Sequence, residues 1–136
     1  MAYNLLKGKK GIIFGALNEM SIAWKVAEKC LEEGAQIVLT NTPLSIRMGK
    51  VEAFAEKNHI PLIPADATNV EDLNHLLKES MRHFGGKIDF ILHSVAMSLN
   101  VRKKRSYDDL DYDFLQKTLD ICLLYTSDAA DEARSV

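Results

Sequence analysis

The alternation of short apolar runs with amphipathic stretches most constrains the fold of this chain. Four nearly continuous apolar runs lie at Lys10–Gly15, Ala35–Thr40, Pro61–Ala65 and Ile88–Ser94, and no linker rich in Pro or Gly separates them. Parallel strands covered by helices on both faces are apolar on both sides, so consecutive βαβ units carry this pattern. The sequence therefore predicts an α/β fold with a doubly wound parallel sheet of the Rossmann type.

The stretches that follow these runs are predicted to be helices. They cover Ser21–Glu33, Leu44–Lys57 and Val70–His83, and a fourth begins near Asp108 or Asp111. In the first helix the apolar residues recur at helical spacing, and they are Ile22, Ala23, Val26, Ala27, Cys30 and Leu31. Right-handed crossovers place the strands in the order 3-2-1-4, and ligands bind beyond their carboxyl ends where that order reverses.

Composition narrows the class of protein. A chain of 136 residues fits one domain. A hydrophobic content of 47%, a charged content of 26% and a net charge of -2 give no reason to expect nucleic acid or a membrane as partner. The start has no signal-peptide core, and no run approaches the ~18 apolar residues of a membrane span. We expect a cytoplasmic protein that binds small molecules. The two cysteines and four histidines show no metal-ligand spacing.

Gly15 ends the first predicted strand, and a short polar loop leads from it to Ser21 and Ala23. A strand that turns at once into a helix, with phosphate at the helix N-terminus, needs a residue without a side chain at the turn. The usual G-x-G-x-x-G spacing is absent. Ser21 and Ala23 are small enough for close contact between helix and sheet, and the serine hydroxyl suits a phosphate. Alone, this spacing is also that of a structural turn.

Two further constellations follow the third and fourth strands. Asp66 comes directly after the third, where a carboxylate suits the ring and amine of adenine; the alternative is an Asp that caps a turn. Ser94, Val95 and Ala96 close the fourth strand, where small side chains let a ribose and a nicotinamide pass; the alternative is a buried strand end. Together with Gly15 they mark the carboxyl ends of three strands, which predicts a dinucleotide site.

These stretches resemble the enoyl-acyl carrier protein reductases of bacterial fatty acid synthesis, a divergent branch of the short-chain dehydrogenase/reductases. Gly15–Ala23 resembles the modified glycine motif of that family, in which serine and alanine replace the later glycines. Ala65–Ala67 resembles its adenine-binding turn, and Asp89–Ala96 resembles its fourth-strand signature. The resemblance covers residues 5 to 121. It implies a Rossmann fold and NADH as the cofactor.

The resemblance also implies individual contacts. It places Ser98 beside the acyl substrate, and it implies NADH contacts at Gly15, Ser21, Ile22, Thr42, Asp66, Ala67 and Val95. The second strand is followed by Asn41 and Thr42, without the acidic ribose ligand of NAD enzymes or the glutamine often found here. NADPH therefore stays open as an alternative. Arg47 and Lys50 are candidate partners of a 2′-phosphate, or they are simply solvated.

The family's reaction is hydride transfer from the nicotinamide to the β-carbon of an enoyl thioester on acyl carrier protein. It needs a tyrosine and a lysine in a Tyr-x-x-x-x-x-x-Lys arrangement after a fifth strand. Tyr3 and Lys10 have this spacing but lie before and at the very start of the first strand, far from the strand ends where ligands bind. We therefore assign no catalytic residue and expect an inactive cofactor-binding part of a homo-oligomeric enzyme. The alternatives are another short-chain carbonyl reductase and a non-catalytic nucleotide-binding module.

Two segments near the end are less regular. Arg102–Arg105 is a basic run, interpreted as a solvated loop or as a contact for an acidic carrier protein. Residues 122–136 depart from the pattern and resemble the translation of a transposase adapter used in sequencing libraries. We therefore expect residues 1–121 to be the NAD(P)-binding half of one Rossmann domain and 122–136 to be a non-native tail, with a divergent natural terminus as the alternative. The fourth strand is then expected to form an exposed edge.

Overall fold

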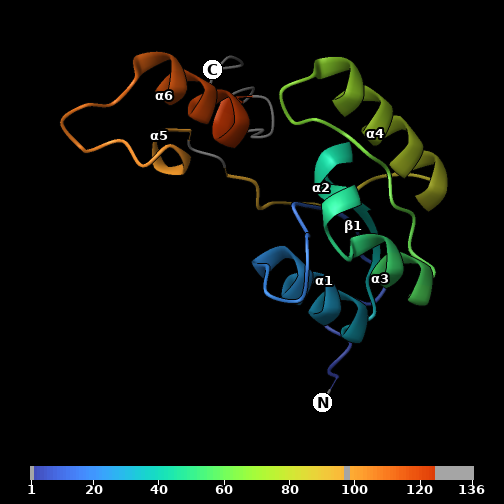
Figure 1. Cartoon of the computed structure of the whole chain (residues 1–136). Helices are drawn as coiled ribbons and strands as arrows, with labels where there is room; N and C mark the ends of the chain where they lie inside the picture. The colour runs from blue at the N-terminus through green and yellow to red at the C-terminus, as the bar shows by residue number, and fades with distance from the viewer. Residues whose placement is uncertain (1, 97–98, 125–136) are drawn as a thin grey trace. The chain divides into compact units, whose positions relative to one another are not determined.

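A computed structural model describes residues 2–96 and 99–124 (Figure 1). The chain divides into two compact units, Met1–Ser94 and Val95–Val136. Within the described residues, no helix combines the length and the apolar character needed to cross a bilayer.

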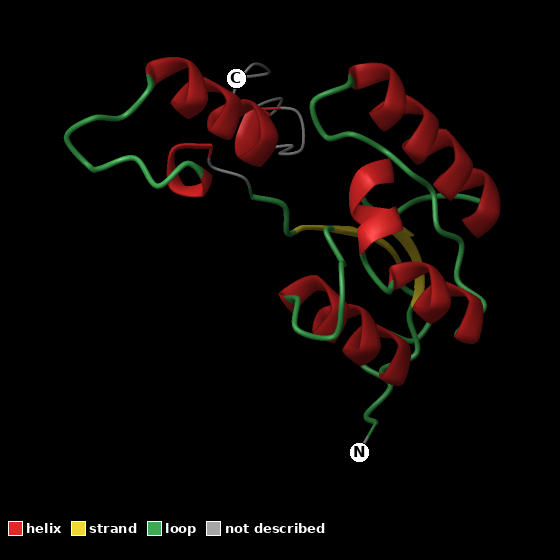
Figure 2. Ribbon diagram, viewed as in Figure 1, coloured by secondary structure: helices red, strands yellow, loops and turns green. Residues whose placement is uncertain are grey.

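The first unit is built on a parallel sheet of three strands (Figure 2). They are β1 (Lys10–Phe14), β2 (Gln36–Thr40) and β3 (Phe90–His93), in the spatial order β2-β1-β3. In this register Phe14 of β1 lies between Thr40 of β2 and His93 of β3. The predicted parallel α/β class is confirmed, because all three strands of this sheet run in the same direction.

The strand expected over Pro61–Ala65 is reduced to a single parallel bridge between Leu62 and Leu39 of β2. Two backbone bonds flank the bridge: the Leu39 amide donates to the Pro61 carbonyl, and the Ile63 amide donates to the Leu39 carbonyl, each at 3.0 Å. The segment therefore lies beside β2, where the order 3-2-1-4 expects it. Its two prolines have no N–H to donate, so it pairs only as a short edge.

One face of the sheet is covered by α1 (Ile22–Glu32) and α3 (Val51–Lys57). The rings of Trp24 and Phe54 meet there with centroids 4.5 Å apart. The buried core of this face consists of Ile13, Ala16, Ala23, Trp24, Ala27, Cys30, Ala35, Ile37, Leu39, Val51, Ala55 and Ile60.

The predicted apolar face of α1 was wrong in one position. Ile22 is 74% exposed and belongs to no buried cluster. The buried arc of α1 centres on Ala27 and includes Trp24, because the large indole ring packs against Phe54 and sets the rotation of the helix. Ile22 therefore lies on the side of α1 that faces solvent, away from the buried arc.

The other face is covered by α4 (Val70–Phe84), which buries Leu76, Ser80 and Phe84. Side chains of neighbouring strand residues point to opposite faces, so this face receives Ile12, Phe14, Val38 and Thr40, all buried. The side chain of Asn69 caps α4 by accepting from the amides of Glu71 and Asp72. Gly85, with φ of 71°, ends the helix in a left-handed conformation. The predicted helix over Val70–His83 is confirmed.

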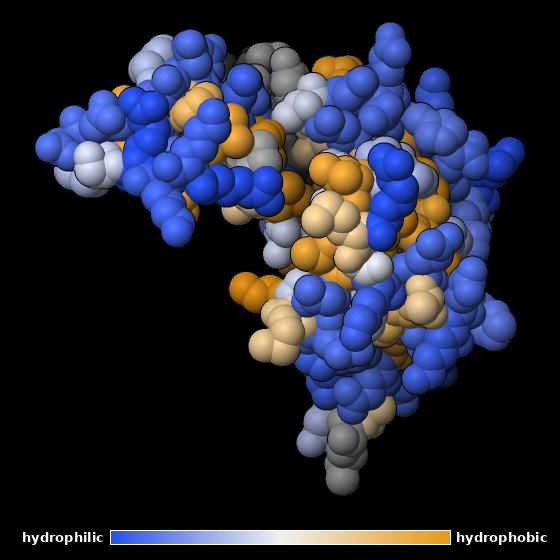
Figure 3. Space-filling model, viewed as in Figure 1, coloured by the Kyte–Doolittle hydropathy of each residue, from blue (hydrophilic) through white to orange (hydrophobic). Residues whose placement is uncertain are grey.

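The single helix expected over Leu44–Lys57 is wrong, because the structure has two. The first, α2 (Pro43–Met48), begins at the Thr42 cap, and α3 begins after Lys50. Between them the Lys50 amide donates to the carbonyl of Leu17 at 2.9 Å instead of continuing a helix. Figure 3 shows apolar side chains gathered over α2, where Leu44 and Met48 are exposed.

The second unit contains α5 (Leu99–Arg102), α6 (Tyr112–Leu119) and a π-helical turn, η1 (Asp120–Leu124). The basic run starts in the last residue of α5 and continues into a loop. Residues 125–136, which carry most of the predicted tail, lie outside the described residues.

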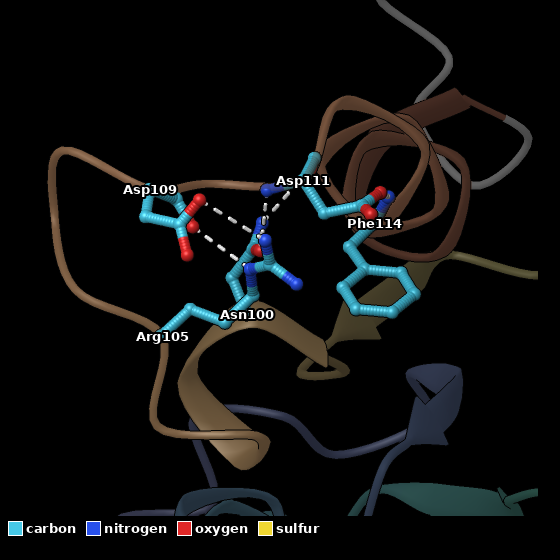
Figure 4. A network of polar contacts seen from close by, with 5 residues as sticks. All are labelled: Asn100, Arg105, Asp109, Asp111 and Phe114. Atoms are coloured by element: carbon cyan, nitrogen blue, oxygen red, sulfur yellow. Dashed lines mark hydrogen bonds and ion pairs between the residues drawn. The ribbon is translucent and has the colours of Figure 1, made fainter.

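Asn100 closes the loop between α5 and α6 (Figure 4). Its Nδ2 donates to the Asp111 carbonyl at 3.1 Å, and its Oδ1 accepts from the Asp111 amide at 2.9 Å. The Asp111 carboxylate in turn accepts from the Phe114 amide at 3.1 Å and caps α6. Within the loop, Arg105 Nε donates to the Asp109 carbonyl at 2.8 Å. The predicted helix start at Asp111 is thus confirmed.

Candidate functional site

The predicted site lies at the carboxyl edge of the sheet. The Gly15 amide donates to the Thr40 carbonyl at 3.1 Å, and the Ser94 amide donates to the Phe14 carbonyl at 2.9 Å. These bonds extend the pairing of β1 with both neighbours by one residue. Gly15 and Ser94 are therefore held side by side at one edge, together with the end of β2.

The loop from Gly15 to Ser21 joins β1 to α1. Gly15 has φ of 112°, a conformation that favours glycine. The Ser21 hydroxyl donates to the Asn18 carbonyl at 2.7 Å and accepts from the Leu17 amide at 3.2 Å. It thus closes the loop and makes no side-chain cap on α1. The backbone N–H groups at the start of α1 form the positive end of the helix dipole, which suits an anion.

Asn41, which the sequence did not single out as a site residue, joins three segments at this edge. It is buried, with 6% of its surface exposed. Its Nδ2 donates to the Ala16 carbonyl at 2.9 Å, and its Oδ1 accepts from the Thr42 amide at 2.8 Å. Its own carbonyl accepts from the Ala65 amide at 3.0 Å. The sequence signal was only a polar residue directly after an apolar strand.

Thr42 follows Asn41 and is half-buried at the start of α2. Its hydroxyl donates to Ser45 Oγ at 2.9 Å and accepts from the Ser45 amide at 3.2 Å. The end of β2 therefore presents amide and hydroxyl groups where many NAD enzymes have a carboxylate. Arg47 and Lys50, the candidate partners of a 2′-phosphate, are both exposed.

Asp66 caps a turn at the end of the edge segment beside β2. Its Oδ1 accepts from the Thr68 amide at 2.8 Å and from the Thr68 hydroxyl at 2.6 Å. Its amide donates to Asp72 Oδ2 at 3.0 Å, which connects the turn to α4. Ala67 is buried with 2% exposed. Asp66 thus caps a turn, and the capped turn holds the residue near the end of β2.

The remaining predicted residues follow β3. Ser94 is half-buried, and the ring of His93 before it meets the ring of Phe14 edge-on, with centroids 6.1 Å apart. Val95 and Ala96 come next in the chain and belong to the second unit. Ser98, the predicted substrate contact, lies outside the described residues.

Tyr3 and Lys10, which have the spacing of a catalytic pair, lie at the other end of β1. The Tyr3 amide donates to Glu33 Oε2 at 3.0 Å, and Lys10 Nζ donates to the Phe84 carbonyl at 2.8 Å. Lys10 is the first residue of β1, so the pair is separated from the carboxyl edge by the length of the strand. Within residues 2–96 and 99–124, no group of three or more His, Cys, Asp or Glu is arranged to hold a metal ion.

A groove of about 1030 Å³ runs between α1 and α3, with Trp24 and Phe54 in its lining. Hydrogen bonds from Lys25 and from the Trp24 indole lower the pKa of Glu28 on its rim. The groove follows the outer sides of the two helices, and only Glu19, Gly49 and Lys50 of its lining come from the connections near the carboxyl edge. We therefore do not place the dinucleotide in it.

Comparison with known proteins identifies the family to which this chain belongs. The family model described as "Enoyl-(Acyl carrier protein) reductase" matches residues 15–136. The chain belongs to this family. The resemblance predicted from Gly15–Ala23, Ala65–Ala67 and Asp89–Ala96 is thereby confirmed.

Curated enoyl-acyl carrier protein reductases are similar over most of this chain. "Enoyl-[acyl-carrier-protein] reductase [NADH] 1" of Rhizobium meliloti is 33% identical over 122 residues, which are 88% of this chain and 44% of that protein. The FabI reductase of Rickettsia bellii is 31% identical over 137 residues, covering 100% of this chain and 52% of that protein. The chain thus spans about half the length of the curated relatives it matches.

Solved structures of the family share the fold. The FabI-NADH complex from Alistipes finegoldii is 65% identical with a TM-score of 0.90, over 98% of this chain and 47% of that chain. The Bacillus cereus reductase with NADP+ and an indole naphthyridinone is 26% identical with a TM-score of 0.80, over 100% of this chain and 52% of that chain. The predicted Rossmann-type architecture is confirmed by these likenesses.

Proposed function

We propose that this chain is the N-terminal, cofactor-binding part of an enoyl-acyl carrier protein reductase and that it binds NADH at the carboxyl edge of the sheet. The observation that carries the proposal is the meeting of the Gly15 loop, the start of α1 and the end of β2 at one edge. The curated relatives are named as NADH enzymes, and the 65% identical structure is an NADH complex.

The proposed cofactor runs along this edge. Its diphosphate lies against the first turn of α1, where unpaired backbone N–H groups and the helix dipole favour negative charge. Its adenosine lies towards the end of β2 and the Asp66 turn, and its nicotinamide extends past the end of β3. The proposed contacts are Gly15, Ser21, Ile22, Thr42, Asp66, Ala67, Ser94, Val95 and Ala96, with Ser98 beside the acyl group.

The exposure of Ile22 has a functional interpretation in this proposal. A β-branched apolar side chain that is 74% exposed in the first turn of α1 gains nothing from the core. Bound beside the diphosphate, it would exclude water from one side of the phosphate and strengthen the bonds that the backbone amides donate. Ile22 thus serves the cofactor edge rather than the packing of α1.

We infer that NADH is preferred over NADPH. The end of β2 offers the hydroxyls of Thr42 and Ser45, which suit a ribose hydroxyl, while Arg47 and Lys50 are exposed and extend from α2 and the turn after it. Titration of the chain with both cofactors tests this inference. Tighter binding of NADPH, lost in Arg47→Ala or Lys50→Ala, would contradict it.

The proposed reaction of the longer enzyme delivers a hydride from NADH to the β-carbon of a trans-2-enoyl thioester on acyl carrier protein, and a proton to the α-carbon. We propose that the enzyme acts in the cytoplasm as a homo-oligomer. No Tyr-x-x-x-x-x-x-Lys pair lies at the carboxyl edge among the described residues. We therefore expect this chain to bind the cofactor without turning over substrate.

A fluorescence titration with NADH tests the proposal directly. The folded chain should bind NADH, and Gly15→Val should weaken binding at least tenfold, because a branched side chain at φ of 112° is strained and stands in the phosphate turn. Gly86→Val is the matched control, since a Cβ there meets nothing within 4 Å. A folded chain that does not bind NADH would contradict the proposal.

We also propose that residues 1–121 are the NAD(P)-binding half of one Rossmann domain and that residues 122–136 are a non-native tail. The encoding DNA tests this. A library prepared without transposase adapters should read a different sequence after codon 121. The same tail in such a library would overturn the proposal.

A further inference from the structure

Three successive carbonyl groups of the loop that begins at Gly15, those of Ala16, Leu17 and Asn18, accept hydrogen bonds from donors within the protein. The Ala16 carbonyl accepts from Asn41 Nδ2 at 2.9 Å. The Leu17 carbonyl accepts from the Lys50 amide at 2.9 Å. Both donors come from the connection between β2 and α3, so this connection holds the loop from outside.

The third of these carbonyl groups is held by a residue of the loop itself. The Asn18 carbonyl accepts from both the hydroxyl and the amide of Ser21, at 2.7 and 2.9 Å. The carbonyl oxygens of residues 16, 17 and 18 are therefore each engaged by protein donors. A carbonyl oxygen that turned towards the start of α1 would carry partial negative charge to the place where the cofactor diphosphate is proposed to bind.

Gly49 is what allows the outer connection to come so close. A Cβ on Gly49 would overlap the Leu17 carbonyl oxygen and would approach Leu17 Cδ1 to 2.8 Å. The backbone φ of Gly49 is -101°, so its conformation is open to any residue. Glycine is required at position 49 only because a larger side chain would collide with Leu17. The break between α2 and α3 thus lies where the chain must touch the loop.

We propose that Asn41 and the Gly49–Lys50 turn form a carbonyl clamp, which holds the Ala16 and Leu17 carbonyls away from the diphosphate of a bound dinucleotide. The proposal rests on the proposed function of this edge. The clamp members contact no cofactor; they are positioning residues that act through the loop. Because the carbonyls are already held before binding, little reorganisation is needed when the anion arrives.

The clamp also connects the two ends of the proposed adenosine diphosphate site. Asn41 Oδ1 accepts from the Thr42 amide while its Nδ2 holds Ala16. A change at Asn41 therefore disturbs the loop and the start of α2 together. Since Asn41 is buried and both its Nδ2 and its Oδ1 are bonded within the protein, its effect on binding must pass through these neighbours.

The first test compares two glycines. Gly49→Ala should speed hydrogen exchange of the amides of residues 15–21 in the ligand-free chain, and should weaken NADH binding about tenfold or more. Gly86→Ala should change neither, because a Cβ there meets nothing within 4 Å and its φ is ordinary. Circular dichroism verifies that both variants are folded at the temperature of the titration.

The second test uses protonation as a switch. Asn41→Asp keeps the oxygen that accepts from the Thr42 amide. It replaces the Nδ2 donor with a second oxygen, which repels the Ala16 carbonyl oxygen when the carboxylate is charged. Burial disfavours the charged carboxylate, and its protonated form can donate to that carbonyl as the amide does. The probe is ADP-ribose, whose diphosphate keeps its charge between pH 5.5 and pH 8. It should bind Asn41→Asp poorly at pH 8 and regain affinity relative to wild type towards pH 5.5. A deficit independent of pH would overturn the role of the Asn41 donor.

The two proposals fail in different ways. If the wild-type chain binds NADH, and Gly49→Ala and Asn41→Asp bind it as tightly with unchanged loop exchange, the carbonyl clamp is overturned and the proposed function remains. If the folded wild-type chain binds no dinucleotide, but both substitutions still speed exchange of residues 15–21 and Gly86→Ala does not, the proposed function fails and the clamp stands as the structure that holds the loop.

Discussion

β1 and β3 are neighbouring strands with similar apolar sequences, and they differ in how much of them is buried. In β1, Ile12, Ile13 and Phe14 are 1%, 0% and 3% exposed. In β3, Ile91 is 48% exposed and its neighbours are half-buried. β1 pairs on both edges, whereas β3 pairs with β1 alone among the described residues.

The difference shows that an apolar run predicts a strand but not its burial. Both runs have the composition of strands covered on two faces, and the expectation of near-complete burial holds for β1 only. α1 and α3 cover one face of β1 and β2, and α4 packs on the other face against β2. An unpaired apolar edge is a site where another strand can add. We therefore expect changes in β1 to cost stability and changes in β3 to alter association.

The largest effect is expected from Ile13→Ala. Ile13 is fully buried between the sheet and α1, so its truncation should lower the free energy of unfolding by about 3 kcal/mol, through lost burial and a residual cavity. Urea denaturation measures this loss. Ile91→Ala is the matched control in β3 and should cost less than about 1 kcal/mol. Equal losses at the two positions would show that β3 is as deeply packed as β1.

Gly11→Ala tests the contact between the two strands themselves. A Cβ on Gly11 would overlap the ring of Phe90, its partner in β3. We expect a loss of about 1–3 kcal/mol in the free energy of unfolding, because the ring must move from its packed position. In a Phe90→Ala background the same substitution should be nearly neutral, since the ring is gone. An undiminished loss in that background would place the cause in the β1 backbone.

Ile91→Lys is expected to change association more than stability. Ile91 is about half exposed, so the free energy of unfolding should shift by no more than about 0.5 kcal/mol. The added charge should reduce association through the edge of β3, which light scattering measures over a concentration series. A cooperative loss of fold in this variant would contradict the open character of β3.

The smallest effect is expected at Cys30 of α1, the helix that packs on β1. Burial raises the pKa of the Cys30 thiol on α1. The folded chain therefore keeps the proton that the unfolded chain loses above about pH 8.5. This contribution to stability is present below that pH and is lost as pH rises through the folded pKa. Urea denaturation between pH 7.5 and 10 should show a steeper decline for wild type than for Cys30→Ala. Parallel curves would mean that the thiol is not shielded.

Several elements follow from local patterns in the sequence. The apolar runs predict β1, β2 and β3 to within two residues of their observed ends, and the Asn69 and Asp111 caps mark the starts of α4 and α6. Each of these signals acts over one strand or one helical turn. The motifs at the strand ends likewise indicated residues that the fold brings to one edge of the sheet, among them Gly15, Ser21 and Asp66.

Other features depend on contacts between distant segments. Within the stretch expected to be one helix, Leu44–Lys57, the one local signal for a break is Gly49, and a lone glycine does not show what the chain meets there. The contact is with the Leu17 carbonyl, in another loop. The exposure of Ile22 follows from where Trp24 packs on α3. In both cases the cause is a contact with a segment far away in the sequence, so a pattern confined to one helix or strand cannot reveal it.

Asn41 shows most clearly where the two kinds of information divide. Its place after an apolar run is enough to locate it at the end of a strand. Its hydrogen bond to the Ala16 carbonyl spans 25 positions of the sequence, and it forms because the pairing of β1 with β2 sets their ends side by side. Apolar periodicity is a property of neighbours in the chain and can be counted there. A buried amide finds its partner through the register of the sheet, which exists only when the chain is folded.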